Sequence, residues 1–347
     1  MTPPNLRTPL LRAALIAAVI VAGLALYGLG PGGNFYLKLA RAPLAPADAA
    51  PYYRESLLHV LLANALGLTG PLQFRLFVLA GWWSGVAAIL ATLRLSHAHL
   101  VLVACVLLTH PSAMIVHAWA CHPDALVFLL TAALLIIRRP WPTAVLAALM
   151  AWANVPMAAV VCLSLATLWL AESARPRALA TCVGALVGAV TCKLALHIFN
   201  IHIAHDRLDL AAQHTSLLLA RWTSPGWPIL YTLYFAHLVW LPSLWLTLRS
   251  SAPRTADALL ATQLLALTAT LFAEDTTRIF AMLAWAPLLH CLWHALTHLA
   301  THRDRHYLRP LVALAVLVTL LAPKFFAWKG ELRTLDDARA YRRAHLF

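Results

Sequence analysis

Two carboxylates stand side by side, three positions before an arginine, in the segment FAEDTTRIF at residues 272–280. The whole chain has only 13 Asp and Glu among 347 residues, so two adjacent acids indicate a specific role. Asp275 could cap the following helix and pair with Arg278 one turn later. Alternatively, Arg278 binds a lipid phosphate, for which a planar guanidinium is well suited, and Glu274 or Asp275 orients it. The pattern is compatible with both roles.

A second group of ionisable side chains lies in HAWACHPDALVF, residues 117–128. Asp124 comes directly after Pro123 and before an apolar run, so it could simply cap the helix predicted there. Alternatively, His122 and Asp124 form a general-base pair or bind a divalent metal ion, with His117 in support. No HExxH or comparable ligand spacing favours the metal.

The first predicted loop, within GPGGNFYLKLARAPLAPADAAPYYRESLLHVLLA at residues 30–63, contains Asp48, Arg54 and Glu55. Its glycines and prolines indicate a shaped loop. It also carries tyrosines that suit a membrane interface or stacking against a sugar, namely Tyr36, Tyr52 and Tyr53. The helix predicted at 56–66 is too short to cross a bilayer, so we expect it along the membrane surface.

Five histidines recur at every fourth residue near the end of a predicted helix: His290, His294, His298, His302 and His306. Steps of four residues drift around a helix by about 40° each, so they form a slanted stripe in which a metal ion could bridge neighbours. Histidine near a helix C-terminus is also favourable by itself. We interpret the stripe as structural.

The elements that position these residues are predicted to be membrane spans. Hydrophobic residues make up 62% of the chain and charged residues 11%, and apolar runs near spanning length recur along it. The formal net charge of +13 would favour nucleic acid in a soluble protein. Here the basic residues lie mainly in loops beside apolar runs, where they orient the chain or contact anionic lipid. The expected partner is the bilayer, with no nucleic acid.

Windows of roughly 17 to 25 apolar residues predict an all-α, polytopic transmembrane bundle with about nine spans. The predicted spans are residues 10–30, 74–94, 99–117, 124–138, 178–201, 227–248, 257–273, 278–297 and 310–323. Residues 141–170 are predicted to form a re-entrant hairpin broken at ANVP, with Asn154 at its tip. We expect one transmembrane domain over residues 1–323, with an outer loop at 31–55 and an extracytoplasmic tail at 324–347.

The first predicted helix follows a short basic segment, which indicates a cytoplasmic N-terminus and a multi-pass protein of the plasma (inner) membrane. In this orientation most acids fall on the outer side: Asp48, Glu55, Asp124, Asp206, Asp209, Glu274, Asp275, Glu331, Asp336 and Asp337. Groups suited to proton or metal chemistry therefore gather at the extracytoplasmic face.

Taken together, these motifs resemble the GT-C superfamily of integral membrane glycosyltransferases, which take a sugar from a polyprenyl-phosphate or pyrophosphate donor on the outer face. The resemblance rests on the first outer loop with its surface helix (NFYLKLA and PYYRESLLHVLLA), the turn HPDALVF, the broken hairpin MAWANVPMAAVV and the late turn DTTR. It covers most of the chain as a pattern. It implies a membrane glycosyltransferase that uses a polyprenyl-phosphate sugar.

The resemblance also implies a catalytic acid in the first outer loop, acting as base or metal ligand. Asp48 is the residue this points to, with Glu55 as a substitute. Asn34 stands before FY, where the family pattern would place an aspartate. Asp124 would be the second acid of the site, with His122 as the alternative partner of the base.

Glycosyl transfer with inversion needs a carboxylate to accept the proton of the acceptor hydroxyl and cationic help for the leaving phosphate. By the resemblance, Arg278 binds the donor phosphate, and Arg54 is the expected second phosphate ligand. Glu274, Asp275 and His117 would support the site, and a divalent metal ion is compatible with it.

Two other classes of protein fit parts of the pattern. A transporter or lipid flippase would need polar groups and broken helices near the bilayer midplane, for which Lys193 and the Asn154 hairpin are the candidates. A non-catalytic membrane subunit of an envelope polysaccharide system would use the outer acids only as helix caps.

Overall fold

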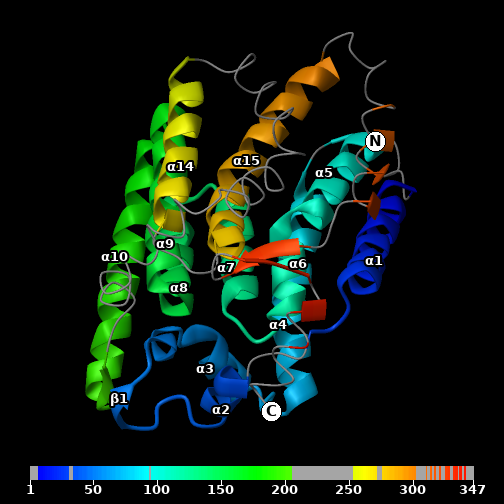
Figure 1. Cartoon of the computed structure of the whole chain (residues 1–347). Coiled ribbons are helices and arrows are strands. Elements are labelled where there is room, and N and C mark those ends of the chain that lie inside the picture. Colours follow the sequence, from blue (N-terminus) through cyan, green and yellow to red (C-terminus); the bar gives the residue numbers. More distant parts are fainter. Residues whose placement is uncertain are drawn as a thin grey trace.

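The chain folds into a bundle of helices with a layer of short elements across one end (Figure 1). The computed structural model describes residues 7–30, 34–93, 95–204, 253–271 and 276–301, together with parts of 310–340. The helices of the bundle are α1 (Arg7–Tyr27), α4 (Pro71–Thr92), α5 (His97–Thr109), α6 (Pro111–Ala118), α7 (Asp124–Ile136), α8 (Pro140–Ala153), α9 (Val155–Ala171), α10 (Arg175–Ile198), α14 (Pro253–Leu271) and α15 (Thr276–Thr301).

Three of the described helices are long and apolar enough to cross a membrane: α1 over Pro9–Tyr27, α4 and α10. Helices α5 and α6 meet at a bend of 50° and would form a fourth span as a pair. Helices α7, α8 and α9 have 13, 14 and 17 residues, fewer than the ~20 of a typical crossing. The predicted span at 227–248, and half of that at 310–323, lie outside the described residues. The chain is thus helical, with three or four helices of spanning length in its described part.

The break predicted at Asn154 is confirmed. Helix α8 ends at Ala153, α9 begins at Val155, and the Asn154 side chain accepts a hydrogen bond from the Met157 amide at 3.2 Å, which caps α9. Next to the break, the Trp152 carbonyl accepts a hydrogen bond from the Leu57 amide at 3.0 Å. The tip of the hairpin therefore reaches the layer of short elements at the end of the bundle.

Small residues let α8 and α10 pack closely. Gly184 and Gly188 lie four positions apart on α10, and a Cβ atom at either would stand 2.1 and 2.3 Å from the carbonyl oxygens of Ala144 and Ala148 on α8. This spacing is the small-xxx-small pattern by which apolar helices approach each other in a membrane. It explains why the hairpin packs against a span-length helix.

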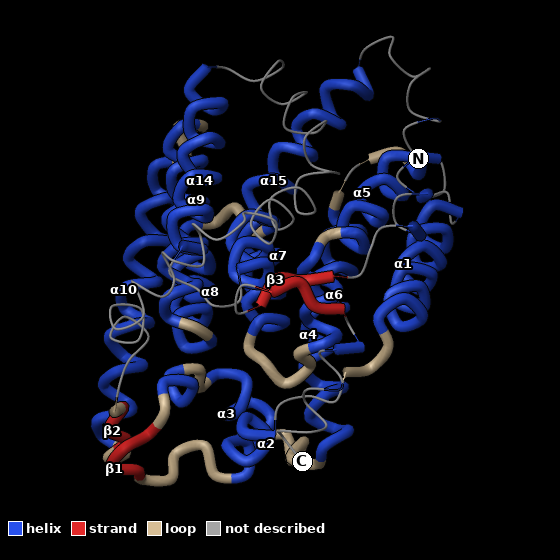
Figure 2. Tube along the Cα trace, viewed as in Figure 1, coloured by secondary structure: helices blue, strands red, loops and turns tan. Residues whose placement is uncertain are grey.

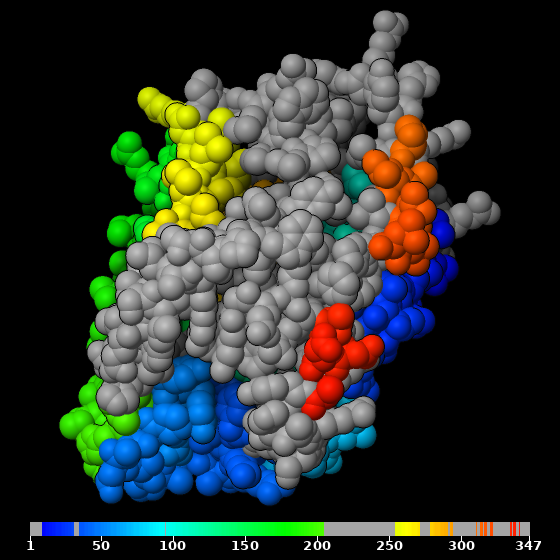
Figure 3. All heavy atoms as spheres, in the orientation of Figure 1, coloured from blue at the N-terminus to red at the C-terminus, as the bar shows by residue number. Residues whose placement is uncertain are grey.

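The layer across the end of the bundle, here named the first-loop layer, holds most of the predicted outer loop. It contains α2 (Asn34–Arg41), β1 (Ala47–Ala50), the 3₁₀ helix η1 (Tyr52–Glu55), α3 (Leu58–Ala65) and β2 (Ile201–Ile203). Figure 3 shows it as blue atoms at the lower end of the molecule, beside the green end of α10. The short helix predicted at 56–66 is confirmed as α3.

Two short strand pairs were not predicted (Figure 2). Strand β1 pairs in parallel with β2, where Ala47 donates to the Asn200 carbonyl and Ala204 donates to the Ala50 carbonyl. This pairing fastens the first-loop layer to the end of α10. Strands β3 (Phe325–Trp328) and β4 (Glu331–Thr334) form an antiparallel hairpin, and β3 contacts α15.

The close contact of α8 with α10 predicts the effect of one methyl group. Gly188→Ala should lower the free energy of unfolding by about 1–3 kcal/mol, because the added Cβ overpacks the Ala148 backbone. Tryptophan fluorescence during detergent denaturation measures this change. Gly81→Ala is the matched control, since its Cβ would meet the Ala125 carbonyl at an ordinary 3.7 Å. Equal stability of the two variants would refute the packing.

Candidate functional site

The centre of the candidate site is a buried ion pair between the starts of two helices. Asp124 is the first residue of α7 and Arg278 lies in the first turn of α15. Arg278 Nε donates to Asp124 Oδ2 at 2.5 Å and Nη2 donates to Oδ1 at 3.0 Å. The Asp124 side chain is 1% exposed and that of Arg278 is 13% exposed. This bidentate geometry is the strong form of an arginine–carboxylate contact.

The helix dipoles act in opposite senses on the two partners. The positive end of α7 favours the Asp124 carboxylate, whereas the positive end of α15 disfavours a cation in its first turn. Asp124 offsets that cost for Arg278 and holds its guanidinium plane in one orientation. The pairing of Arg278 with Asp275 considered above stays a prediction, because Glu274 and Asp275 lie outside the described residues.

A cluster of aromatic rings joins the first-loop layer to the turn before Asp124. Phe35 and Tyr36 of α2 lie 5.6 and 5.2 Å from the His122 ring, measured between centroids. Tyr53 of η1 lies 4.6 Å from Phe35, and His59 of α3 lies 4.7 Å from Tyr36. We name these five residues the ring cluster. Through it the first outer loop contacts His122, which precedes Asp124 by two positions in the chain.

Burial controls ionisation within the ring cluster. His59 is 1% exposed, and the loss of hydration lowers its pKa to about 3, against a smaller opposing effect of the Cys121 carbonyl. Burial also raises the pKa of Tyr53. His59 is therefore a neutral packing group near pH 7. The sequence offered no signal for this, because a lone histidine in an apolar segment looks the same in either role.

Arg54, the predicted second phosphate ligand, lies on η1 next to the ring cluster. It is 7% exposed, and its Nη2 makes a long 3.5 Å contact with the Pro43 carbonyl. Its Nε has no hydrogen-bond partner. Burial lowers the pKa of Arg54, yet a guanidinium stays charged at ordinary pH. Arg54 is thus a buried cation with a donor left over for a ligand.

Glu55 does not line an open site. Its side chain is 5% exposed and forms an ion pair with Lys193 of α10, whose side chain is half exposed. Lys193 falls within the predicted span at 178–201. Its ion pair with Glu55 connects η1 to α10. Spacing in the sequence could not predict this pair, because the two residues are 138 positions apart.

Asp48 and His117 have different surroundings from the ion pair. Asp48 is exposed on β1, next to β2 and the end of α10. Among the described residues, Asp48 forms no ion pair with Arg278. His117 is fully buried, and its Nδ1 donates to the Gly28 carbonyl at 2.7 Å. His117 therefore holds the end of α1 against α6 instead of facing a ligand.

The described residues contain no group of three His, Cys, Asp or Glu side chains that could hold a metal ion. Of the nine predicted site residues, the structure thus brings Asp124 and Arg278 into contact, and His122 lies in the ring cluster two positions before Asp124. Arg54 and Glu55 lie in the adjoining layer.

The chain matches no family model, no curated protein and no solved structure.

The buried ion pair predicts a strong coupling between its members. Asp124→Asn or Arg278→Gln alone should destabilise the protein by about 3–5 kcal/mol, because each leaves a buried charge without its partner. The double variant should lose less than the sum of the two. Denaturation curves of the four proteins measure the coupling, and Asp257→Asn on the exposed face of α14 serves as control. Additive losses would show that the pair does not form.

The buried His59 predicts a pH dependence of stability. Its folded pKa of about 3 lies below the ordinary value near 6.5, so the unfolded state binds the proton first as the pH falls. Stability contributed by the neutral ring is complete above pH ~6.5 and is lost below it, at up to ~1.4 kcal/mol per pH unit. His59→Phe should flatten the decline between pH 7.5 and 5.5. Identical pH profiles of the two proteins would contradict the burial.

Proposed function

We propose that the protein is a membrane glycosyltransferase that takes a sugar from a polyprenyl-phosphate donor at the first-loop end of the bundle. The observation that carries the proposal is the bidentate pair of Asp124 with Arg278 beside the ring cluster. Asp124 occupies the Nε–Nη2 edge of the guanidinium. The pair holds the guanidinium in one plane, so a donor phosphate would approach a cation whose orientation is already set.

Arg54 supports the same phosphate site. The Asp124–Arg278 pair is neutral overall, so by itself it would attract an anion only weakly. Arg54 adds a positive charge with an unused donor in the adjoining layer. In the low-dielectric surroundings of this layer, a guanidinium stabilises the charge that grows on a leaving phosphate more strongly than water does.

In the proposed reaction, the acceptor hydroxyl attacks the anomeric carbon, and the bond between that carbon and the phosphate oxygen breaks. The electron pair stays on the polyprenyl phosphate, where Arg278 and Arg54 stabilise it. Asp48 accepts the hydroxyl proton. We assign this role to Asp48 because it is an exposed carboxylate of the first-loop layer, whereas Glu55 and Asp124 are held in ion pairs.

The membrane setting belongs to the same proposal. An isoprenoid tail would stay among the apolar helices while its phosphate lies at the first-loop end. We place this end outside the plasma (inner) membrane, with a cytoplasmic N-terminus and about nine crossings once the chain beyond the described residues is included.

The structure weakens the case for a transporter. Both features that favoured one, Lys193 and the break at Asn154, lie at the first-loop layer and contact it through Glu55 and Leu57. Polar groups at one end of a bundle suit a surface site better than a pathway through the midplane.

Donor binding and turnover test the proposal separately. Purified protein in nanodiscs would be given radiolabelled polyprenyl-phosphate sugars, and both retained donor and released sugar would be counted. Asp48→Asn should reduce release by about 100-fold or more, as expected for loss of a general base, and leave binding within twofold. Arg278→Lys should weaken binding about tenfold, since lysine cannot reproduce the bidentate geometry.

Asp257→Asn, at an exposed carboxylate of α14, should match the wild type in both assays. Wild-type protein that neither binds nor turns over any donor would sink the proposal and favour a non-catalytic subunit. Full turnover by Asp48→Asn would remove Asp48 from the mechanism alone.

A further inference from the structure

A cavity of about 400 Å³ lies at the other end of the bundle, between the last turns of α4 and α7 and the middle of α15. It is separate from the phosphate site proposed above. His290, which lines it, follows Arg278 by 12 residues on α15, a rise of about 18 Å along the helix axis. None of the residues assigned to glycosyl transfer lines this cavity.

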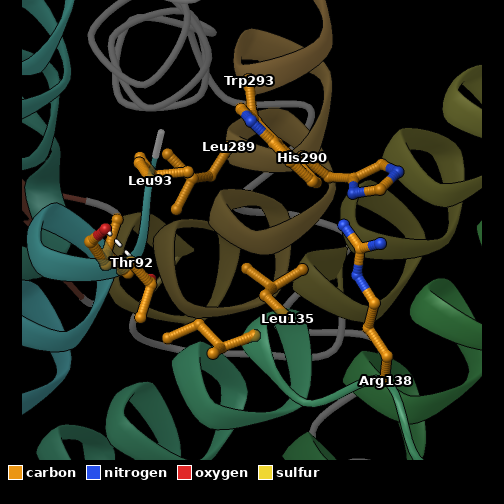
Figure 4. A pocket seen from close by; sticks show the side chains of 9 residues that line it. Thr92, Leu93, Leu135, Arg138, Leu289, His290 and Trp293 are labelled. Atoms are coloured by element: carbon orange, nitrogen blue, oxygen red, sulfur yellow. Dashed lines mark hydrogen bonds between the residues drawn. The ribbon is translucent and has the colours of Figure 1, made fainter. Parts of the chain in front are cut away.

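One wall of the cavity is cationic. Figure 4 shows Arg138 and His290 pointing toward one another on the same side. His290 is 8% exposed, and its Nε2 donates to Glu172 Oε1 at 2.6 Å. Arg138 Cζ lies 6.0 Å from the centroid of the Trp293 ring, close enough for a cation–π contact. Arg138 itself is exposed.

A second arginine offsets the negative end of α7. Arg177 donates to the Leu134 carbonyl and, at 3.3 Å, to the Leu135 carbonyl, so it neutralises part of the dipole there. Among the residues that the structure describes at this wall, Arg138 and Arg177 outnumber the carboxylate of Glu172, which leaves a net positive charge even with His290 neutral. This positive charge attracts an anion to the wall.

The remaining walls are apolar. Leu93, Leu135 and Leu289 face the space opposite Arg138 in Figure 4. The Thr92 hydroxyl on the far side already donates to the Ala88 carbonyl at 2.6 Å. A volume of about 400 Å³ falls within the range of small-molecule sites and exceeds what a phosphate ion fills. The cavity thus suits a ligand with an anionic head and a hydrocarbon part.

We propose that this cavity binds an anionic phospholipid, with the phosphate at Arg138 and the start of an acyl chain along α4, α7 and α15. The cavity lies at the end of α4, a helix long enough to span a bilayer, and so at the depth of lipid headgroups. Basic pockets between helices at that depth are a common form of lipid-headgroup site. A soluble phosphate would gain nothing from the leucine walls.

Lipid retention by the full-length protein tests the proposal. Protein reconstituted with equal phosphatidylglycerol and phosphatidylcholine would be examined by native mass spectrometry. The wild type should retain phosphatidylglycerol selectively. Arg138→Gln should lower its affinity about fivefold, the effect expected of one basic side chain at an anionic lipid. Leu135→Trp should lower it as well, because the indole fills the cavity.

Arg139→Gln is the matched control, because Arg139 is the exposed neighbour of Arg138 and does not line the cavity. It should retain lipid within twofold of the wild type. Equal loss in the Arg138 and Arg139 variants would reduce the effect to general surface charge and overturn the proposal. About 10 mM inorganic phosphate is enough to compete with a weak headgroup contact. Displacement of the lipid by this phosphate would overturn the proposal too. The readout is retained lipid, so a failure of glycosyl transfer leaves this test intact.

Discussion

The buried pair of Asp124 with Arg278 is the contact on which the functional account depends. Two charges are removed from water where α7 and α15 begin, and each would be costly there without the other. Because α15 places a cation at the positive end of its own dipole, the pair fixes how the two helices meet. It also holds the Arg278 guanidinium in one orientation.

Hydropathy and helix-breaking residues predicted much of the fold. Apolar runs located α1, α4 and α10, and the break at Asn154 follows from an asparagine two positions before a proline in an otherwise helical segment. The count of about nine spans stays a prediction, because windows of apolar residues do not decide whether a 13-residue helix such as α7 crosses the bilayer. The parallel pairing of β1 with β2 was missed since its strands are three and four residues long.

Several residues of the candidate site could be singled out from the sequence, but the residues that they pair with could not. Scarce acids and arginines near one predicted face were enough to single out Asp124, Arg278, Arg54 and Glu55. Their partners come from 154 and 138 positions away in the chain, and spacing in one sequence carries no information over such separations. Glu55 therefore changed from a candidate base to the partner of Lys193, whereas Arg278 gained an orienting carboxylate.

A structure with a bound donor analogue tests the central claim most directly. The ligand would be a polyprenyl-phosphonate sugar, whose carbon–phosphorus bond resists cleavage, and cryo-electron microscopy of the protein in nanodiscs would locate it. Our account predicts phosphonate oxygens about 3 Å from the Arg278 guanidinium, within hydrogen-bond range, and the sugar at the first-loop layer. A phosphonate bound elsewhere, with the Asp124–Arg278 pair closed and out of reach of any ligand, would contradict it.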